Sequence, residues 1–537
     1  MAGSDTERLH QLGYAQELRR GMRTFSNFAV SFTIISILSG CLTLFAFAMN
    51  TGGPAVMTLG WLFVGFFVLM VALGMAEVAS SYPTAGGLYY WAAKLADESG
   101  GNGAAWSWFV GWFNLVGQVA VTAGIDFGLA FFINAFLNIG YGFPSDPPHT
   151  ILIYAIVLFI HGLLNTFGIR IVRLLNDVSV WWHLAGVAAI VAVTVVLNQH
   201  SRTDLGTVFS TGVNNTSADP ALSFPGPLIF GIPLYVGLIG LLNAQYTLTG
   251  FDASAHMAEE THEAHLSAPR GIVWSVVISV IAGFILLVAM NVGITPDKAF
   301  TDANGAAIDG YTHALNAAAA SGIAGAPTQI WIDAVGQTGG LFILLIVIGA
   351  QFYCGMSSVT ANSRMIYAFS RDGAIPGSKF WHRINPRTRT PTNSIWLAAG
   401  AAFLLGLPYL YSSVAYAAVT SIAVIGLYVA YVAPVFLRLR AGSRFKEGPW
   451  TLGRWSRPVG IIATVWVAFI FVLFMLPQAL PINISTLNYT PIVFIIVLGG
   501  AAIWYAVSAK NWFKGPRVQG TSEELAAIER DLELAGG

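Results

Sequence analysis

The sequence predicts an all-α integral membrane protein with twelve transmembrane helices. Of its 537 residues, 55% are apolar and only 10% are charged, and the mean hydropathy is positive. Soluble domains carry charge on about a quarter of their residues. Twelve apolar windows also match the ~20 residues that a helix needs to cross the bilayer core. A third observation is that the basic residues are concentrated on one side of these windows.

Each predicted helix corresponds to one apolar window. The windows are residues 26–50, 55–80, 105–138, 149–168, 176–197, 227–257, 270–294, 334–369, 393–409, 412–437, 459–480 and 490–509. Window 393–409 is short for a span, and window 334–369 is so long that it must tilt or leave the bilayer. Because the number of windows is even, both termini are expected on the same side.

The lysine and arginine residues predict which side that is, because loops facing the cytoplasm carry an excess of them. With the N-terminus inside, all 26 basic residues except Arg202 and Lys298 fall in inner loops or tails. We therefore predict a multi-pass protein of the cytoplasmic (plasma) membrane with both termini in the cytoplasm. Residues 1–24 are polar and the first apolar window is long enough to span, so no cleavable signal peptide is expected.

Several classes of function lack the residues they need. The two cysteines, Cys41 and Cys354, lie inside apolar windows, which argues against a disulfide framework or a metal site. We find no cluster of His, Asp and Glu with metal-ligand spacing and no GxxxxGK[ST] loop for nucleotides. The basic residues lie between spans and not on a soluble domain. The prediction is therefore a protein that is not an enzyme, with no cofactor, no metal and no nucleic-acid partner.

Two spans contain helix-weakening residues near their middle. The first carries Ser39-Gly40, and the sixth, which ends in TLTGFDASAHMAEET, carries Thr249-Gly250. Glycine costs about 1 kcal/mol in a helix interior, and small residues also permit close helix packing. Two interruptions five spans apart favour two broken helices in an inverted repeat, which is typical of secondary transporters. Freed amides can hold a carboxylate and freed carbonyls an ammonium, so this site suits a zwitterion such as an amino acid.

Four stretches carry a resemblance to a known family: NTGGPA (50–55), AEVASSYPTAGGLYYWAA (76–93), GFDASAHMAEET (250–261) and CGMSSVTANSRMIYAFSRDGAIP (354–376). Over about residues 20–510, the chain resembles the amino acid–polyamine–organocation superfamily, and within it the γ-aminobutyrate/amino acid permease group. The resemblance implies a LeuT-type five-plus-five inverted repeat with spans 11 and 12 added, and amino acid uptake, often with protons. One departure is Leu38, which stands where the family usually has the first glycine of a triplet in span 1.

The resemblance also divides the chain into parts. We expect a cytoplasmic N-terminal segment, two five-helix repeats joined by an extracellular loop, a final helix pair and a cytoplasmic tail. Their boundaries are 1–24, 25–198, 199–226, 227–440, 441–511 and 512–537. The tail contains a short amphipathic helix candidate, TSEELAAIERDLELAGG, which we interpret as a solvated end in preference to a partner-binding element.

By the same resemblance, main-chain groups of both broken helices would bind substrate. The amides would come from Ser39, Gly40 and Cys41, and the carbonyls from Thr249, Gly250 and Phe251. The alternative for the first group is helix packing alone. Phe251 would also cap the substrate as a thin gate, although phenylalanines in membrane helices usually face lipid or the core.

Ionisable and hydroxyl residues are candidates for ion coupling. A charge at the bilayer centre costs about 2.5–3.5 kcal/mol, so Asp252 should face the interior, where it either ties the unwound segment or carries a proton. His183 lies where some proton-coupled relatives place a lysine; it could carry a proton or be a satisfied interior histidine. Ser357 and Ser358 lie where sodium-coupled relatives place hydroxyl ligands, which keeps sodium open.

The third span carries Asn114, Gln118 and Asp126. On an ideal helix the first two share a face, and Asp126 lies about a third of a turn away. Asn114 and Gln118 are candidates for reading the substrate side chain. Asp126 is a second protonation candidate or an outer-vestibule residue.

Three charged residues near the predicted cytoplasmic ends of spans 2 and 8 are candidates for inner-gate or interface contacts. They are Glu77, Arg364 and Asp372.

The resulting functional hypothesis is a proton-coupled secondary active transporter that imports γ-aminobutyrate or an α-amino acid by alternating access. Its partners would be the small-molecule substrate, protons or sodium, and the lipid bilayer. The alternatives are an amino acid exchanger, a sodium-coupled symporter and a choline or polyamine permease. A non-transporting nutrient sensor or a channel is the remaining class.

Overall fold

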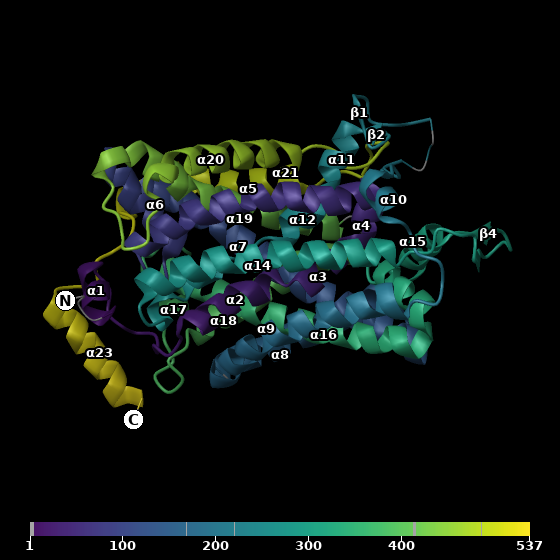
Figure 1. The fold of residues 1–537 in the computed structure, drawn as a ribbon. Helices are drawn as coiled ribbons and strands as arrows, with labels where there is room; N and C mark the ends of the chain where they lie inside the picture. Colours follow the sequence, from purple (N-terminus) through teal and green to yellow (C-terminus); the bar gives the residue numbers. More distant parts are fainter. Residues whose placement is uncertain are drawn as a thin grey trace.

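The structure is a computed structural model that describes residues 5–167, 169–217, 219, 221–411, 415–484 and 486–536. Long helices run side by side and form a single elongated bundle (Figure 1). Within the described residues, eleven helices are long and apolar enough to cross a membrane. This confirms the predicted all-α membrane fold.

Each of the eleven helices corresponds to one predicted window, and only the sixth window has no such helix among the described residues. They are Thr24–Thr43, Gly53–Ser81, Gly103–Tyr141, Pro147–Phe167, Arg170–Leu197, Ala264–Val292, Gly325–Arg371, Thr392–Leu410, Ala415–Arg444, Gly453–Leu473 and Thr490–Trp512. Their main helical parts are α2 (Thr24–Ile35) with α3 (Ile37–Thr43), α5 (Gly53–Ser81), α7 (Gly103–Tyr141), α8 (Pro147–Phe167), α9 (Ile169–Val191), α14 (Ala264–Val292), α16 (Gly325–Arg371), α18 (Thr392–Gly406), α19 (Ala415–Ala441), α20 (Ser456–Leu473) and α21 (Thr490–Trp504).

Short elements connect these helices. The short helices are α1 (Asp5–Gln11), α4 (Phe45–Asn50), α6 (Gly87–Glu98), α10 (Leu205–Ser210), α11 (Leu234–Gly240), α12 (Leu242–Thr247), α13 (Ala253–His256), α15 (Gly310–Ser321), α17 (Ser378–Trp381), α22 (Lys510–Trp512) and α23 (Ser522–Gly536). Two antiparallel hairpins decorate the loops at one end: β1 (Leu228–Ile229) pairs with β2 (Ile232–Pro233), and β3 (Phe300–Thr301) pairs with β4 (Ala307–Ile308).

The sixth predicted span is missing from the eleven because it is not one continuous helix. It consists of α11, α12 and α13, followed by a 3-10 helix at Ala258–Glu260. The residues between Thr247 and Ala253 are not helical. The predicted interruption of this span is therefore present.

The long eighth window contains an interruption that was not predicted. Its helix, α16, extends from Gly325 to Arg371 and has a non-helical residue, Gly336, with φ 80° and ψ 169°. Glycine reaches this region without the steric cost of a side chain. The break leaves residues 337–371 as one continuous helix, still longer than the ~20 residues that a span needs, so tilt or extension beyond the bilayer stays a prediction.

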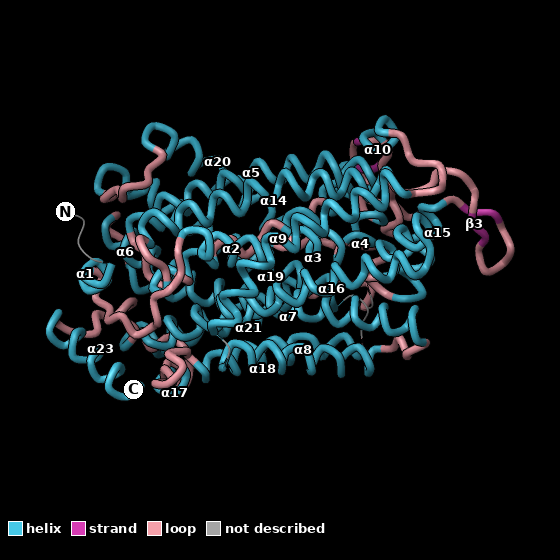
Figure 2. Tube along the Cα trace, turned by 60° about the horizontal axis from the view of Figure 1, so that its bottom comes forward, coloured by secondary structure: helices cyan, strands magenta, loops and turns pink. Residues whose placement is uncertain are grey.

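Both termini lie at the same end of the bundle (Figure 1), as an even number of crossings requires. The C-terminal helix α23 lies beside α1 there (Figure 2). It is not the solvated end that we predicted: Leu525 is buried, and the Glu529 carboxylate accepts hydrogen bonds from His10 Nε2 at 2.8 Å and the Gln16 amide at 2.6 Å. The two terminal segments are therefore packed together.

Candidate functional site

The first span is interrupted at Ser36, three residues before the predicted position. Ser36 lies between α2 and α3 with φ 40° and ψ 78°, in the left-handed region. Ser39 and Gly40, the predicted break, are helical, and their amides both donate to the Ser36 carbonyl at 2.8 Å. The prediction failed because glycine permits a break but does not force one. The amides of Ile37 and Leu38 have no acceptor among the described residues.

The interruption of the sixth span contains Gly250, as predicted. Gly250 has φ +92°, and a Cβ atom there would lie 2.2 Å from Ile34 Cγ2 on α2. Both the backbone conformation and the lack of space therefore require glycine. The carbonyls of Gly250 and Phe251 accept hydrogen bonds from the Ala253 amide and the Ser31 hydroxyl. Of the three predicted carbonyls, only that of Thr249 has no donor in the described part of the chain.

The two broken spans contact each other along their length. The Asn243 amide group on α12 donates to the Cys41 carbonyl on α3 at 3.1 Å. A Cβ atom on Gly40 would lie 2.6 Å from Thr247 Cγ2, so Gly40 serves close helix packing at this point. The Phe251 ring is buried against Tyr431, with ring centroids 4.7 Å apart. The main-chain groups of residues 39–41 and 249–251 thus lie together in the interior.

Asp252, in the interruption of the sixth span, is completely buried in a polar cluster. Its Oδ2 atom accepts a hydrogen bond from Gln118 Nε2 at 2.7 Å, and its Oδ1 atom accepts one from the Tyr431 hydroxyl at 2.6 Å. Its Oδ2 atom also lies 3.2 Å from Nε2 of His256, one helical turn later. The Tyr431 hydroxyl in turn accepts from the Gly250 amide at 3.2 Å, so the cluster also holds the unwound backbone.

His256 was missed by the sequence analysis. Its Nδ1 atom lies 3.1 Å from the Ala85 carbonyl, and its Nε2 atom lies 3.3 Å from Asn114 Nδ2. The signal was its spacing of four residues from Asp252, which places two side chains on one helix face. Asn114 and Gln118, which are predicted to read a substrate side chain, contact this Asp–His pair.

Asp126 forms a second buried pair with a histidine. His161 Nδ1 on α8 lies 2.9 Å from Asp126 Oδ1, and both side chains are 0% exposed. Asp126 therefore does not face an open vestibule in this structure. The opposite atoms, Asp126 Oδ2 and His161 Nε2, have no partner in the described residues. Gly355 on α16 leaves the space for this pair, because a Cβ atom there would lie 1.8 Å from Asp126 Oδ1.

His183 contacts the break in the first span. Its Nδ1 atom lies 2.7 Å from the Ser179 carbonyl, so this nitrogen carries the hydrogen. Its Nε2 atom then accepts from the Ser36 hydroxyl at 2.7 Å. His183 is therefore a satisfied interior histidine that also fixes the break, because its neutral form meets both partners.

Ser357 and Ser358 are not brought to one site. The Ser357 hydroxyl contacts Asn176 on α9, whereas the Ser358 hydroxyl lies 2.9 Å from Thr122 Oγ1 on α7. Consecutive residues of a helix point about 100° apart. The two hydroxyls consequently face different helices, which does not favour the predicted sodium ligands.

Known proteins that are similar to this chain identify its family. A model of the amino acid permease family matches residues 23–498, which is most of the chain. The chain belongs to the amino acid permease family. It is therefore a membrane transporter and not an enzyme.

Curated relatives resemble this permease over nearly its full length. The Arabidopsis thaliana protein named amino-acid permease BAT1 is 40% identical over 95% of each chain. Its homolog from Oryza sativa subsp. japonica is 41% identical over 96% of each chain. A Saccharomyces cerevisiae protein named GABA-specific permease is 30% identical over 96% of this chain and 86% of its own.

The end of the permease that carries both termini contains buried ion pairs. Arg364 Nε on α16 lies 2.8 Å from Glu260 Oε1, and Arg371 Nη2 lies 3.2 Å from Glu259 Oε1. Both glutamates directly follow the broken sixth span and were not singled out from the sequence. A buried arginine such as Arg364 requires an anionic partner, and that requirement was the signal.

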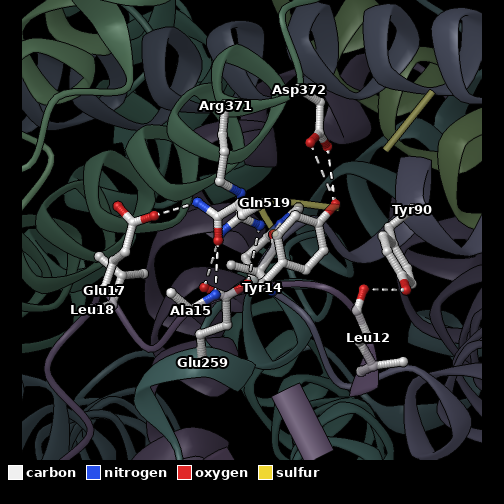
Figure 3. A network of polar contacts seen from close by, with 12 residues as sticks. Leu12, Tyr14, Ala15, Glu17, Leu18, Tyr90, Glu259, Arg371, Asp372 and Gln519 are labelled. Carbon is white, nitrogen blue, oxygen red and sulfur yellow. Dashed lines mark hydrogen bonds and ion pairs between the residues drawn. The ribbon is translucent and has the colours of Figure 1, made fainter. Parts of the chain in front are cut away.

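The N- and C-terminal segments make further buried contacts at this end (Figure 3). The Asp372 carboxylate accepts a hydrogen bond from the Tyr14 hydroxyl at 3.3 Å, which Figure 3 shows. It also accepts hydrogen bonds from the Tyr89 hydroxyl at 2.7 Å and from the Arg517 amide at 3.0 Å. Burial raises the pKa of the Asp372 carboxyl, and the adjacent Arg371 guanidinium opposes that rise. Asp372 thus joins α16 to both tails.

Glu77, the third gate candidate, belongs to a different contact. Its carboxylate accepts from the Ser456 hydroxyl at 2.5 Å and the Leu452 amide at 3.2 Å, and lies 3.4 Å from Arg438 Nε. These contacts join α5 to α19 and to the start of α20. Glu77 therefore contacts neither Arg364 nor Asp372 and serves as an interface residue.

Proposed function

We propose that this permease imports γ-aminobutyrate or an α-amino acid across the plasma membrane by alternating access, coupled to protons moving in the same direction. The observation that carries the proposal is the buried Asp252–His256 pair at the break of the sixth span. Both termini are placed in the cytoplasm, which the concentration of lysine and arginine supports.

The geometry of the pair supports one exchangeable proton. The hydrogen on His256 Nδ1 is directed at the Ala85 carbonyl. If no further proton were bound, the lone pair of Nε2 could accept from Asn114 Nδ2 at 3.3 Å but would also face the Asp252 Oδ2 atom at 3.2 Å. A proton between the two atoms converts this repulsion into an ion pair or hydrogen bond. Loading the proton also removes a net negative charge from a buried site, and this favours closure.

The main-chain groups that remain free at the breaks support an amino acid as cargo. We propose that the amides of Ile37 and Leu38 bind the substrate carboxylate, next to the predicted Ser39, Gly40 and Cys41. The Thr249 carbonyl would accept from the ammonium group. Phe251, packed on Tyr431, would close the site. The name of the 30% identical relative supports γ-aminobutyrate as one candidate.

We assign Asp126 and His161 as a second proton-binding pair. Two of their polar atoms are buried without partners, so a change of protonation there would alter the contact between α7 and α8. We assign Arg364 and Asp372 to closure of the inner gate. His183 is proposed to position the first break and not to carry the coupling proton.

Uptake into proteoliposomes tests the proposal. The purified chain, in sodium-free buffer, should accumulate a labelled amino acid when the lumen is alkaline, and a competition panel should identify the preferred cargo. Uptake that follows sodium and ignores the pH gradient would overturn proton coupling. A requirement for internal amino acid would identify an exchanger, and a preference for choline or a polyamine would change the cargo. Binding without flux would indicate a sensor.

A further inference from the structure

A cavity rich in arginine lies at the end of the bundle that carries both termini. Its volume is about 400 Å³. Its walls come from three parts of the chain that are distant in sequence: the N-terminal segment, the turn before α18, and α23. Four arginines line it, namely Arg19, Arg20, Arg387 and Arg389. The transport proposal uses none of them.

The positive charge of this cavity is poorly compensated. Glu529 is the one carboxylate in its described lining, and its Oε1 atom already accepts from His10 Nε2. Asp5 lies outside the lining, 3.8 Å from Arg20 Nη1. Burial lowers the pKa of the Arg20 guanidinium despite Asp5, which is consistent with incomplete compensation. Arg19 and Arg387 form no ion pair in the described part of the chain.

Two of the arginines are held in place by neutral acceptors. Arg389 donates from Nε to the Glu17 carbonyl at 2.7 Å and from Nη2 to the Gln16 carbonyl at 3.0 Å. Arg20 donates to the Thr261 carbonyl and to the Gln16 side chain, and its Nε is buried without a partner in the described residues. These bonds fix the guanidiniums without neutralising them, so little ordering is needed when an anion enters.

Arginine guanidinium groups bind phosphate through paired, charge-assisted hydrogen bonds. Several guanidinium groups around one small cavity suit an anion with several oxygen atoms better than they suit a single carboxylate. Basic pockets at the cytoplasmic side of membrane proteins bind phosphate-bearing lipid headgroups. A soluble phosphate offers the same chemistry.

We propose that this cavity binds a phosphate-bearing anion, which bridges the N-terminal segment, the turn before α18 and the C-terminal helix. The source of the phosphate is either an anionic lipid headgroup or a soluble phosphate. The proposal is independent of the transported substrate and of proton coupling.

Thermal unfolding of the purified full-length chain, followed by tryptophan fluorescence, tests this inference. We would titrate it in detergent with inorganic phosphate, with pyrophosphate, and with micelles that contain phosphatidylglycerol or a phosphatidylinositol phosphate. Phosphatidylcholine is the zwitterionic control. The double variant Arg19→Gln/Arg387→Gln removes the two exposed arginines. The matched variant Arg440→Gln/Lys446→Gln removes two exposed charges, one in the last turn of α19 and one after that helix, and neither residue lines the cavity.

We expect an anionic probe to raise the unfolding midpoint of the natural chain and of the matched variant. The cavity variant should bind on the order of a hundredfold more weakly, because each arginine–phosphate contact contributes about a factor of ten. A response to lipid alone assigns the phosphate to the membrane, and a response to soluble phosphate assigns it to the cytosol. The inference fails if no anion shifts the natural chain, or if both double variants respond equally.

Discussion

At the scale of single residues, two buried aspartates of this permease each lie beside a buried histidine. Asp252 is paired with His256, and Asp126 is paired with His161, each at 0% exposure. An isolated buried charge is expensive, so these residues are retained only where a partner shares or neutralises the charge. The histidine partner is therefore needed, together with the carboxylate, to explain why each charge is buried.

Replacing the Asp252 carboxylate should uncouple transport from protons. In Asp252→Asn the amide keeps the shape and the contact with Gln118 but cannot hold the shared proton. We expect proton-driven uptake into vesicles to fall on the order of a hundredfold, the lower end of the range for loss of a positioned proton carrier. The remaining uptake should no longer respond to an imposed pH gradient. Asp219→Asn, in an exposed loop, is the control. An unchanged pH response in Asp252→Asn would contradict the proposed role.

The stability of the pair is a separate prediction. His256→Gln leaves the Asp252 carboxylate buried without a counter-charge and should lower the free energy of unfolding by about 3–5 kcal/mol. Asp252→Asn/His256→Gln removes both charges and should recover most of that loss. Unfolding midpoints of the natural chain, the two single variants and the double variant form a double-mutant cycle, which measures the coupling between the two residues. Additive effects would show that the two residues are not coupled.

At the scale of helices, the interruptions decide how the two broken spans meet. The glycine at the first of them is needed for packing and not for flexibility. Gly40 lies inside α3, where a Cβ atom would lie 2.6 Å from Thr247. The actual break, Ser36, is held by His183. Each interruption therefore depends on a contact from another helix.

Gly40→Ala should destabilise the permease because it forces α3 away from α12. Overpacking of this kind costs about 1–3 kcal/mol. Gly400→Ala on α18 is the matched control: a Cβ atom there meets nothing within 4 Å, and its helix should be stabilised by up to about 1 kcal/mol. Thermal unfolding in detergent compares the two. Equal midpoints would mean that α3 and α12 do not pack this closely.

His183→Gln should separate positioning from proton coupling. The variant loses the ring that fixes Ser36, so uptake should fall about tenfold, as expected for one lost hydrogen bond at a positioning residue. The remaining uptake should still depend on the pH gradient, because the Asp252–His256 pair is intact. Vesicle uptake at several imposed gradients measures both quantities. Loss of gradient dependence would instead identify His183 as the proton carrier.

At the scale of the whole molecule, buried contacts hold together the end that carries both termini. The ion pairs of Glu259 and Glu260 with α16 are buried there, and Asp372 joins the two tails to the same helix. In an alternating-access transporter, such contacts must break when this end opens.

Weakening these pairs should expose the two native cysteines. Cys41 and Cys354 are both buried. If each ion pair contributes about 1.5 kcal/mol to closure, Glu259→Gln/Glu260→Gln should raise the rate of maleimide labelling at least about tenfold. Glu263→Gln, an exposed neighbour, should label at the original rate. Identical rates in all three proteins would mean that the pairs do not control access.

The sequence by itself determined the membrane fold, ten of the long helices outside the two broken spans, and the presence of a break at Gly250. These follow from composition and local backbone chemistry, which act within one helix. Only the tertiary structure decided that the first break is at Ser36, that His161 and His256 are the partners of the carboxylates, and that α23 packs on the N-terminal segment. These depend on contacts between segments far apart in the chain, and in a bilayer such contacts are chosen by shape and hydrogen bonding between helices, which hydropathy does not encode.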